Sequence, residues 1–124
     1  MKSDTSSPPD IAARCREAVL EVEERKGGDI RVLRIGDISS LTDFFLICSG
    51  NNERQVRAIA EGIQLRLKTD NVRPSHVEGF SPGRWILLDY GDFVVHVFDR
   101  ETRAFYGLEK LWADAPDVTE EYVS

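Results

Sequence analysis

The stretch that decides the fold of this chain is Trp85-Ile86-Leu87-Leu88-Asp89-Tyr90-Gly91-Asp92-Phe93-Val94-Val95-His96-Val97-Phe98, which follows Glu78-Gly79. It predicts a β-hairpin, because two runs of apolar, β-branched and aromatic residues flank a short turn that contains glycine. With Tyr90-Gly91 as the loop, the predicted pairs are Asp89 with Asp92, Leu88 with Phe93, Leu87 with Val94, Ile86 with Val95 and Trp85 with His96.

The two faces of this hairpin differ, because successive side chains of a strand point to opposite sides of the sheet. The first face is entirely apolar and consists of Ile86, Leu88, Phe93, Val95 and Val97. The second face carries Trp85, Leu87, Val94, His96 and Phe98 and leads to two carboxylates at the tip. We expect the first face to be core, whereas the second face requires another explanation.

Apolar residues at helical spacing predict two amphipathic helices before the hairpin. The apolar stripe of the first helix consists of Ile11, Cys15, Ala18 or Val19, and Val22. The preceding Ser7-Pro8-Pro9-Asp10 has the serine, proline and acid that are typical of a helix N-terminus, so we expect the helix to start there. The stripe of the second helix is Val56, Ile59, Ala60, Ile63 and Leu67. Asn52 with Gln55 resembles a capping box at its start.

The remaining elements complete a layered fold. Residues 29–35 and 43–49 predict strands, and the second is apolar enough for a central strand that is covered on both faces. A short strand is expected within residues 75–80, a helix at 102–106 and a helical turn at 108–112. This order predicts an α/β (α+β) fold with a mixed β-sheet of about five strands and helices packed mainly on one face.

Length and charge limit the classes of function. At 124 residues the chain is expected to form one domain, which we place at 10–114 between a flexible lead (1–9) and an acidic tail (115–124). The net charge of −6 disfavours direct nucleic-acid binding, which relies on basic residues. The excess of acidic residues is compatible with a basic protein partner, or simply with an acidic tail that is exposed to solvent.

Without an apolar run of about 18 residues we expect no membrane span. Cys15 and Cys48 sit at apolar positions and are expected to be free thiols in a reducing cytosol.

No pattern of catalytic, cofactor-binding or metal-ligating residues is found in the sequence. His76 and His96 lack metal-ligand spacing with the two cysteines. Asp89 and Asp92 are more typical of a turn than of a cation site. The loop 49–52 lacks the glycines and the lysine of a phosphate-binding loop. We therefore predict that the protein is not an enzyme.

Several motifs together resemble the ribosomal silencing factor (Iojap, RsfS) family over residues 11–114. They are Asp29-Ile30, Thr42 to Gly50, Arg54-Gln55-Val56, Glu78-Gly79, Trp85 to Asp92, His96-Val97-Phe98, Arg103, Tyr106 and Leu108-Glu109-Lys110-Leu111-Trp112. The resemblance implies a cytoplasmic, non-enzymatic factor that binds the large ribosomal subunit through ribosomal protein number fourteen. It would block joining of the small subunit, repress translation when nutrients are short, and often form homodimers. It also implies a fold similar to that of nucleotidyltransferases without their catalytic acids.

The expected partner-binding residues combine the second hairpin face with the C-terminal motifs. They are Trp85, Leu87, Asp89, Tyr90, Asp92, His96, Arg103, Tyr106, Glu109 and Trp112. The aromatic residues would form a desolvated centre, and the acids would complement basic groups of the partner. Three alternatives stay open. The residues Phe105, Tyr106, Leu111 and Trp112 could cover this face, the face could bind a second copy, or the chain could be a nucleotide-binding, nucleotidyltransferase-like protein.

Overall fold

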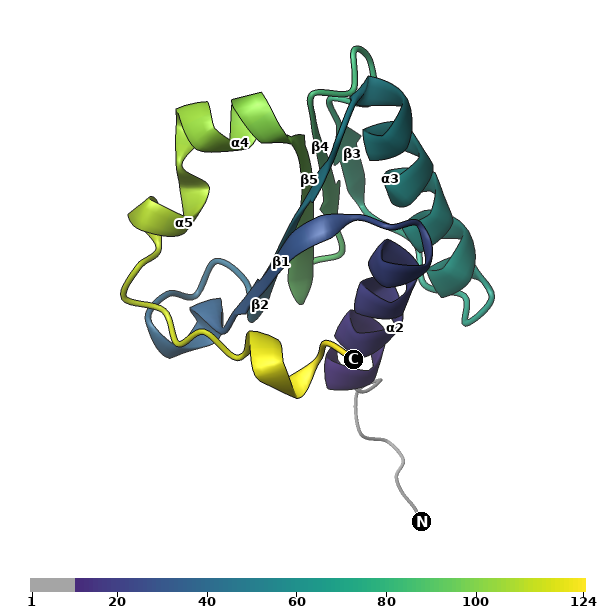
Figure 1. Cartoon of the computed structure of the whole chain (residues 1–124). Coiled ribbons are helices and arrows are strands. Elements are labelled where there is room, and N and C mark those ends of the chain that lie inside the picture. The colour runs from purple at the N-terminus through teal and green to yellow at the C-terminus, as the bar shows by residue number, and fades with distance from the viewer. Residues whose placement is uncertain (1–10) are drawn as a thin grey trace.

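The computed structural model describes residues 11–124 and arranges them around a mixed five-stranded sheet with strand order β1-β2-β5-β4-β3 (Figure 1). The elements are α2 (Ile11–Glu24), β1 (Gly28–Leu33), the 3₁₀ turn η1 (Ile35–Asp37), β2 (Phe44–Gly50), α3 (Glu53–Lys68), β3 (His76–Glu78), β4 (Trp85–Asp89), β5 (Phe93–Asp99), α4 (Arg100–Tyr106), α5 (Leu108–Leu111) and η2 (Thr119–Glu121). Strands β2 and β5 are parallel, and the other neighbouring pairs are antiparallel. The predicted fold class is confirmed.

The hairpin of β4 and β5 forms, but the predicted pairs are wrong by two residues. Asp89 lies opposite Val94, and the N–H of Tyr90 donates to the carbonyl oxygen of Phe93 at 2.9 Å, so the loop is Gly91-Asp92. Gly91 has a φ of +85°, which glycine adopts without the strain that a Cβ would introduce. A shift of two residues keeps every side chain on its predicted face, because the alternation has a period of two.

Helices α2 and α3 cover one face of the sheet (Figure 1). Both predicted helical stripes are confirmed, apart from Ile11, which is only partly buried. The five hairpin residues of the first face are fully buried beneath these helices: Ile86, Leu88, Phe93, Val95 and Val97. Cys15 and Cys48 belong to the same core and are free thiols. The predicted helix start at residues 7–10 and the lead 1–9 lie outside the described residues.

The N-terminus of α3 is capped largely as the sequence predicts. The side chain of Asn52 accepts a hydrogen bond from the N–H of Gln55 at 2.8 Å. The side chain of Gln55 returns to the N–H of Asn51 at 2.6 Å, one residue before the position expected in a capping box.

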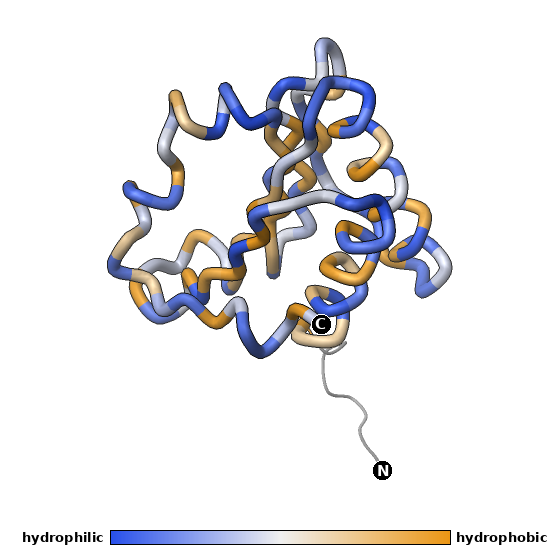
Figure 2. Tube along the Cα trace, viewed as in Figure 1, coloured by the Kyte–Doolittle hydropathy of each residue, from blue (hydrophilic) through white to orange (hydrophobic). Residues whose placement is uncertain are grey.

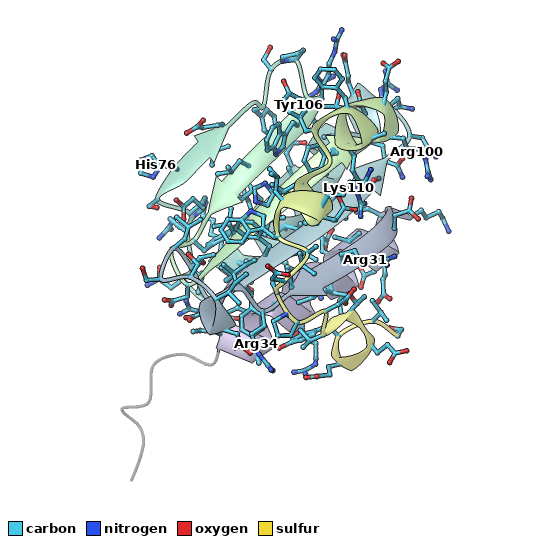
Figure 3. All side chains as sticks on the ribbon, turned by 90° about the vertical axis from the view of Figure 1, so that its left-hand side faces the viewer. Arg31, Arg34, His76, Arg100, Tyr106 and Lys110 are labelled. Atoms are coloured by element: carbon cyan, nitrogen blue, oxygen red, sulfur yellow. The ribbon has the colours of Figure 1, made fainter. Side chains whose placement is uncertain are left out.

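A second layer, made of α4, α5 and the chain from there to Ala115, lies on the other face of the sheet (Figures 1 and 3). In Figure 2 short hydrophobic segments interrupt the hydrophilic trace of α4 and α5. A second buried cluster forms beneath this layer from Leu33, Ile35, Phe45, Ile47, Val94, Phe98, Leu108 and Ala115. The predicted strand 29–35 ends early at Leu33, because Ile35 turns into η1 and joins this cluster.

Residues 115–124, which the sequence suggests are an acidic tail, pack against the domain. Ala115, Val118 and Tyr122 are buried. The N–H of Val118 donates to the carbonyl oxygen of Val32 at 2.8 Å, and the N–H of Ser124 donates to the Glu23 carboxylate at 3.0 Å. The expectation of a solvated tail is corrected, because apolar side chains at three positions anchor this acidic segment. No helix within residues 11–124 is long and apolar enough to cross a membrane.

Candidate docking surface

Most of the exposed large apolar side chains of residues 11–124 lie on the side of the sheet opposite α2 and α3. They are Ile38 and Leu41 in the segment that begins with η1, Phe105 and Tyr106 on α4, and Leu111 on α5. Exposed apolar groups that gather on one side of a molecule mark sites of protein interaction. We define the docking surface as Trp85, Leu87, Phe105, Tyr106, Leu111 and Trp112. Ile38 and Leu41 extend the same side, and the sequence offers no signal for them beyond two apolar residues between the predicted strands 29–35 and 43–49.

The C-terminal helices cover only part of the second hairpin face. Phe105 and Leu111 are 80% and 76% exposed, so they do not pack on the sheet. Trp112 does pack there, with its ring centroid 5.4 Å from that of Phe45 on β2. Over β4 the cover is incomplete, and Trp85 and Leu87 remain partly exposed. Trp112 therefore helps to cover the core, whereas Phe105 and Leu111 are available to a partner.

Trp85 is held in place from three directions. Its ring stacks on Phe98 at a centroid distance of 4.8 Å and lies 4.9 Å from the ring of Tyr106. Its indole Nε1–H donates to Nδ1 of His96 at 3.2 Å. An aromatic side chain with a fixed orientation loses less entropy on binding than a mobile one, so Trp85 is a preorganised part of the docking surface.

His96 lies beneath this surface rather than on it. Its side chain is buried, with a relative exposure of 4%. Burial lowers its pKa to about 4, against the opposing charge of Asp89, so the imidazole is neutral near pH 7. Because Nδ1 accepts the indole hydrogen bond, the ring proton resides on Nε2, which has no hydrogen-bond partner within residues 11–124. His96 can therefore support Trp85, but it cannot contact a partner directly.

The three predicted site residues at the tip of the hairpin, Asp89, Tyr90 and Asp92, lie in different surroundings. The Asp89 carboxylate accepts a hydrogen bond from the N–H of Gly91 at 2.8 Å, which orders the turn, and Asp92 is exposed. Tyr90 lies on the opposite face, where its ring stacks on Phe93 at 4.8 Å, and burial raises its pKa to about 12. The structure thus separates Tyr90 from the docking surface.

Arg103 and Glu109 form a partly buried ion pair that connects α4 to α5. Arg103 donates from Nε and Nη2 to one Glu109 oxygen at 3.0 and 2.8 Å, and from Nη1 to the hydroxyl of Ser49 at 2.8 Å. Burial raises the pKa of Glu109, but the hydrogen bonds and charge of Arg103 outweigh it and hold this pKa below its usual value. These contacts assign the pair a role in holding the second layer on β2.

The loop between β2 and α3, compared above with a phosphate-binding loop, forms hydrogen bonds within the protein itself. Asn51 Oδ1 accepts a hydrogen bond from Arg100 at 3.0 Å, and Asn52 caps α3. A cavity of about 760 Å³ adjoins this loop. Within residues 11–124 no group of three His, Cys, Asp or Glu side chains is placed to hold a metal ion.

Comparisons with known proteins agree on one family. The family described as "Ribosomal silencing factor during starvation" matches residues 8–124. A "Ribosomal silencing factor RsfS" from Halalkalibacterium halodurans is 45% identical over 106 residues, which cover 86% of this chain and 91% of that protein. A "Protein Iojap, chloroplastic" from Zea mays is 35% identical over 77% of this chain and 41% of its own length.

Two crystal structures share the fold. One, of a protein from Chromobacterium violaceum, superposes with a TM-score of 0.82 at 35% identity and covers 85% of this chain and 88% of that chain. The other, from Bacillus halodurans, has a TM-score of 0.74 at 43% identity and covers 83% and 93% of the two chains.

Proposed function

This chain belongs to the ribosomal silencing factor family, and we propose that its docking surface binds the large ribosomal subunit through ribosomal protein number fourteen. Bound there, it would sterically block joining of the small subunit and so repress translation under nutrient limitation. An action on ribosomes implies a cytoplasmic location, and the regulatory role of the family implies that binding, rather than catalysis, is the activity.

The observation that supports this proposal is the cluster of exposed and partly exposed aromatic and aliphatic side chains on β4, α4 and α5. Protein interfaces depend on a few large side chains in a desolvated centre, with charged groups at the rim. Trp85, Phe105 and Tyr106 supply such a centre. Asp89 and Asp92 lie at the end of the same hairpin, where they can complement basic groups of a ribosomal protein.

Gradient co-sedimentation with isolated large subunits tests the proposal. The wild-type chain should travel with large subunits and reduce the yield of joined ribosomes when small subunits are added.

The double variant Phe105→Ser, Leu111→Ser should bind large subunits at least about tenfold more weakly, since it removes two exposed apolar contacts. Leu65→Ser is the matched control, because Leu65 is 63% exposed on α3, on the other side of the sheet. A wild-type chain that stays at the top of the gradient, or leaves subunit joining unaffected, contradicts the proposal.

The acidic tip can be tested separately. Asp92→Lys should weaken large-subunit binding, because Asp92 is exposed and its side chain is free to meet a basic group. Asp89→Asn removes the charge of Asp89 but keeps an oxygen that can accept the hydrogen bond from Gly91, so the turn is preserved. Unchanged binding by the combined variant would remove the tip from the interface.

A homodimer built on the docking surface is the rival use of the same residues. Sedimentation velocity at several concentrations detects it. A dimer that dissociates in the Phe105→Ser, Leu111→Ser variant, while this variant still binds large subunits, would assign the surface to self-association.

A further inference from the structure

A cleft of about 510 Å³ adjoins the docking surface where α4 meets the start of β4. Its lining is Gly79, Pro82, Arg84, Trp85, Glu101, Thr102, Phe105 and Tyr106. Three aromatic side chains, one carboxylate and the guanidinium of Arg84 therefore line one cleft. Tyr106, one of its rings, is labelled in Figure 3.

The three rings lie at different angles to one another. Tyr106 lies 4.9 Å from Trp85 at an interplanar angle of 50°, and Phe105 meets Tyr106 edge to face at 5.0 Å and 90°. Phe105 and Tyr106 are 80% and 53% exposed, so the protein's own core does not use up their surfaces. The face of an aromatic ring carries partial negative charge and attracts cations.

The charged groups of the cleft favour a cationic guest. Glu101, in the first turn of α4, is exposed and has no hydrogen bond or ion pair through its side chain among residues 11–124. The nearby Arg84 is already paired, with its Nε 3.1 Å from the Glu53 carboxylate. An unpaired carboxylate and three aromatic rings that line the same cleft form a combination that suits a cationic side chain.

We propose that this cleft receives an arginine side chain of a basic partner protein. The planar guanidinium can stack on an aromatic ring and pair with the Glu101 carboxylate, which the compact ammonium of lysine does less well. Under the function proposed above, on which this identification of the partner rests, the arginine belongs to the ribosomal protein. Trp85 and Tyr106 are shared between the docking surface and the cleft, so the guest would sit at the edge of the apolar contact.

A titration with a small probe tests the cleft without ribosomes. N-acetyl-arginine amide should shift the indole N–H signal of Trp85 in NMR spectra, while that of Trp112 serves as the internal reference. N-acetyl-citrulline amide, which has nearly the same shape and no charge, should bind markedly more weakly.

Glu101→Gln should weaken binding of the arginine probe about threefold or more, an effect typical of a single exposed charge pair. Glu61→Gln, an exposed acid on α3, should leave it unchanged. Equal binding of both probes, or no effect of Glu101→Gln, overturns the proposal.

Large-subunit binding then shows whether the cleft is used in the complex. Phe105→Leu keeps apolar bulk but removes the ring, so it should weaken subunit binding about two- to fivefold, as expected for the loss of an exposed cation–π contact. Glu101→Gln should have a similar effect. If wild type binds subunits and both variants bind equally well, the arginine site is wrong and the proposed function stands. If the arginine probe binds but wild type does not co-sediment, the proposed function fails and the site stands.

Discussion

The two faces of the sheet use the same hairpin in different ways. On one face, Ile86, Phe93 and Val95 are fully buried beneath α2 and α3. On the other, Trp85 and Leu87 remain partly exposed beside the second layer. The first face contributes stability, and the second face leaves large side chains partly exposed, which is why we propose it as the surface for recognition.

The lengths of the covering helices explain the difference. Helices α2 and α3 have 14 and 16 residues and present continuous apolar stripes to the sheet. Helices α4 and α5 have 7 and 4 residues, too few turns to cover five strands. They are held instead by the Arg103–Glu109 pair and the buried Leu108, whereas Phe105, Tyr106 and Leu111 stay exposed.

Truncation of a core residue on the helix-covered face should have the largest effect on stability. Phe93→Ala should lower the free energy of unfolding by about 3–5 kcal/mol, because it leaves a cavity beneath α2 and α3. Leu87→Ala on the other face should cost about 1 kcal/mol, since Leu87 is only partly buried. Urea denaturation measures both values, and similar losses for the two variants would contradict the distinction between the faces.

The next largest effect is a dependence of stability on pH, which arises from His96 on the second face of the hairpin. The pKa of His96 is about 4 in the folded protein and near 6.5 when solvated. Between these pH values the unfolded chain binds more protons, so stability falls as the pH is lowered from 6.5 to 4 and this contribution then levels off. The difference in pKa corresponds to about 3 kcal/mol.

Denaturation curves at pH 7 and pH 4 check this expectation. His96→Gln is the comparison, because a glutamine oxygen can still accept the hydrogen bond from Trp85 but does not titrate. The variant should lose less stability than wild type between the two pH values. The same loss in both proteins would show that His96 does not remain neutral.

Loss of the ion pair that holds the second layer should have an intermediate effect. Arg103→Met should cost about 2 kcal/mol, because it removes the hydrogen bonds to Glu109 and to the buried Ser49 hydroxyl. Arg34→Met is the control, since Arg34 forms an exposed pair with Asp37 of a kind that contributes at most about 1 kcal/mol. Equal thermal stability of the two variants would mean that the Arg103 pair does not anchor the layer.

The smallest effect on stability is expected at the docking surface. Phe105→Ser combined with Leu111→Ser should change the free energy of unfolding by less than about 0.5 kcal/mol, because neither side chain is packed in the core. The same variant should have the largest effect on subunit binding. A clear loss of stability in chemical denaturation would show that these residues support the fold instead.

Particular residues show how far the sequence could predict the candidate site. Trp85, Leu87 and Tyr106 are on the partly exposed side, as expected from strand alternation and the C-terminal motif. Tyr90 is not, because the loop lies one residue later than predicted, at Gly91-Asp92, so Tyr90 lies opposite Phe93 and stacks on its ring on the helix-covered face. The exposure of Ile38 and Leu41 could not be predicted from periodicity, because the two residues lie in a segment with neither the spacing of a strand nor that of a helix.

The sequence by itself determined the family, the five-stranded mixed fold, both helical stripes and the two faces of the hairpin. These features can be recognised from local periodicity and motifs, because the spacing of apolar residues matches the geometry of a helix or a strand that buries one face. Only the tertiary structure decided that Trp85 is hydrogen-bonded to His96, that residues 115–124 pack on β1 and α2, and that Glu101 lines the same cleft as three aromatic rings. Those arrangements depend on side chains brought together from distant segments, and no repeat in the sequence encodes such contacts.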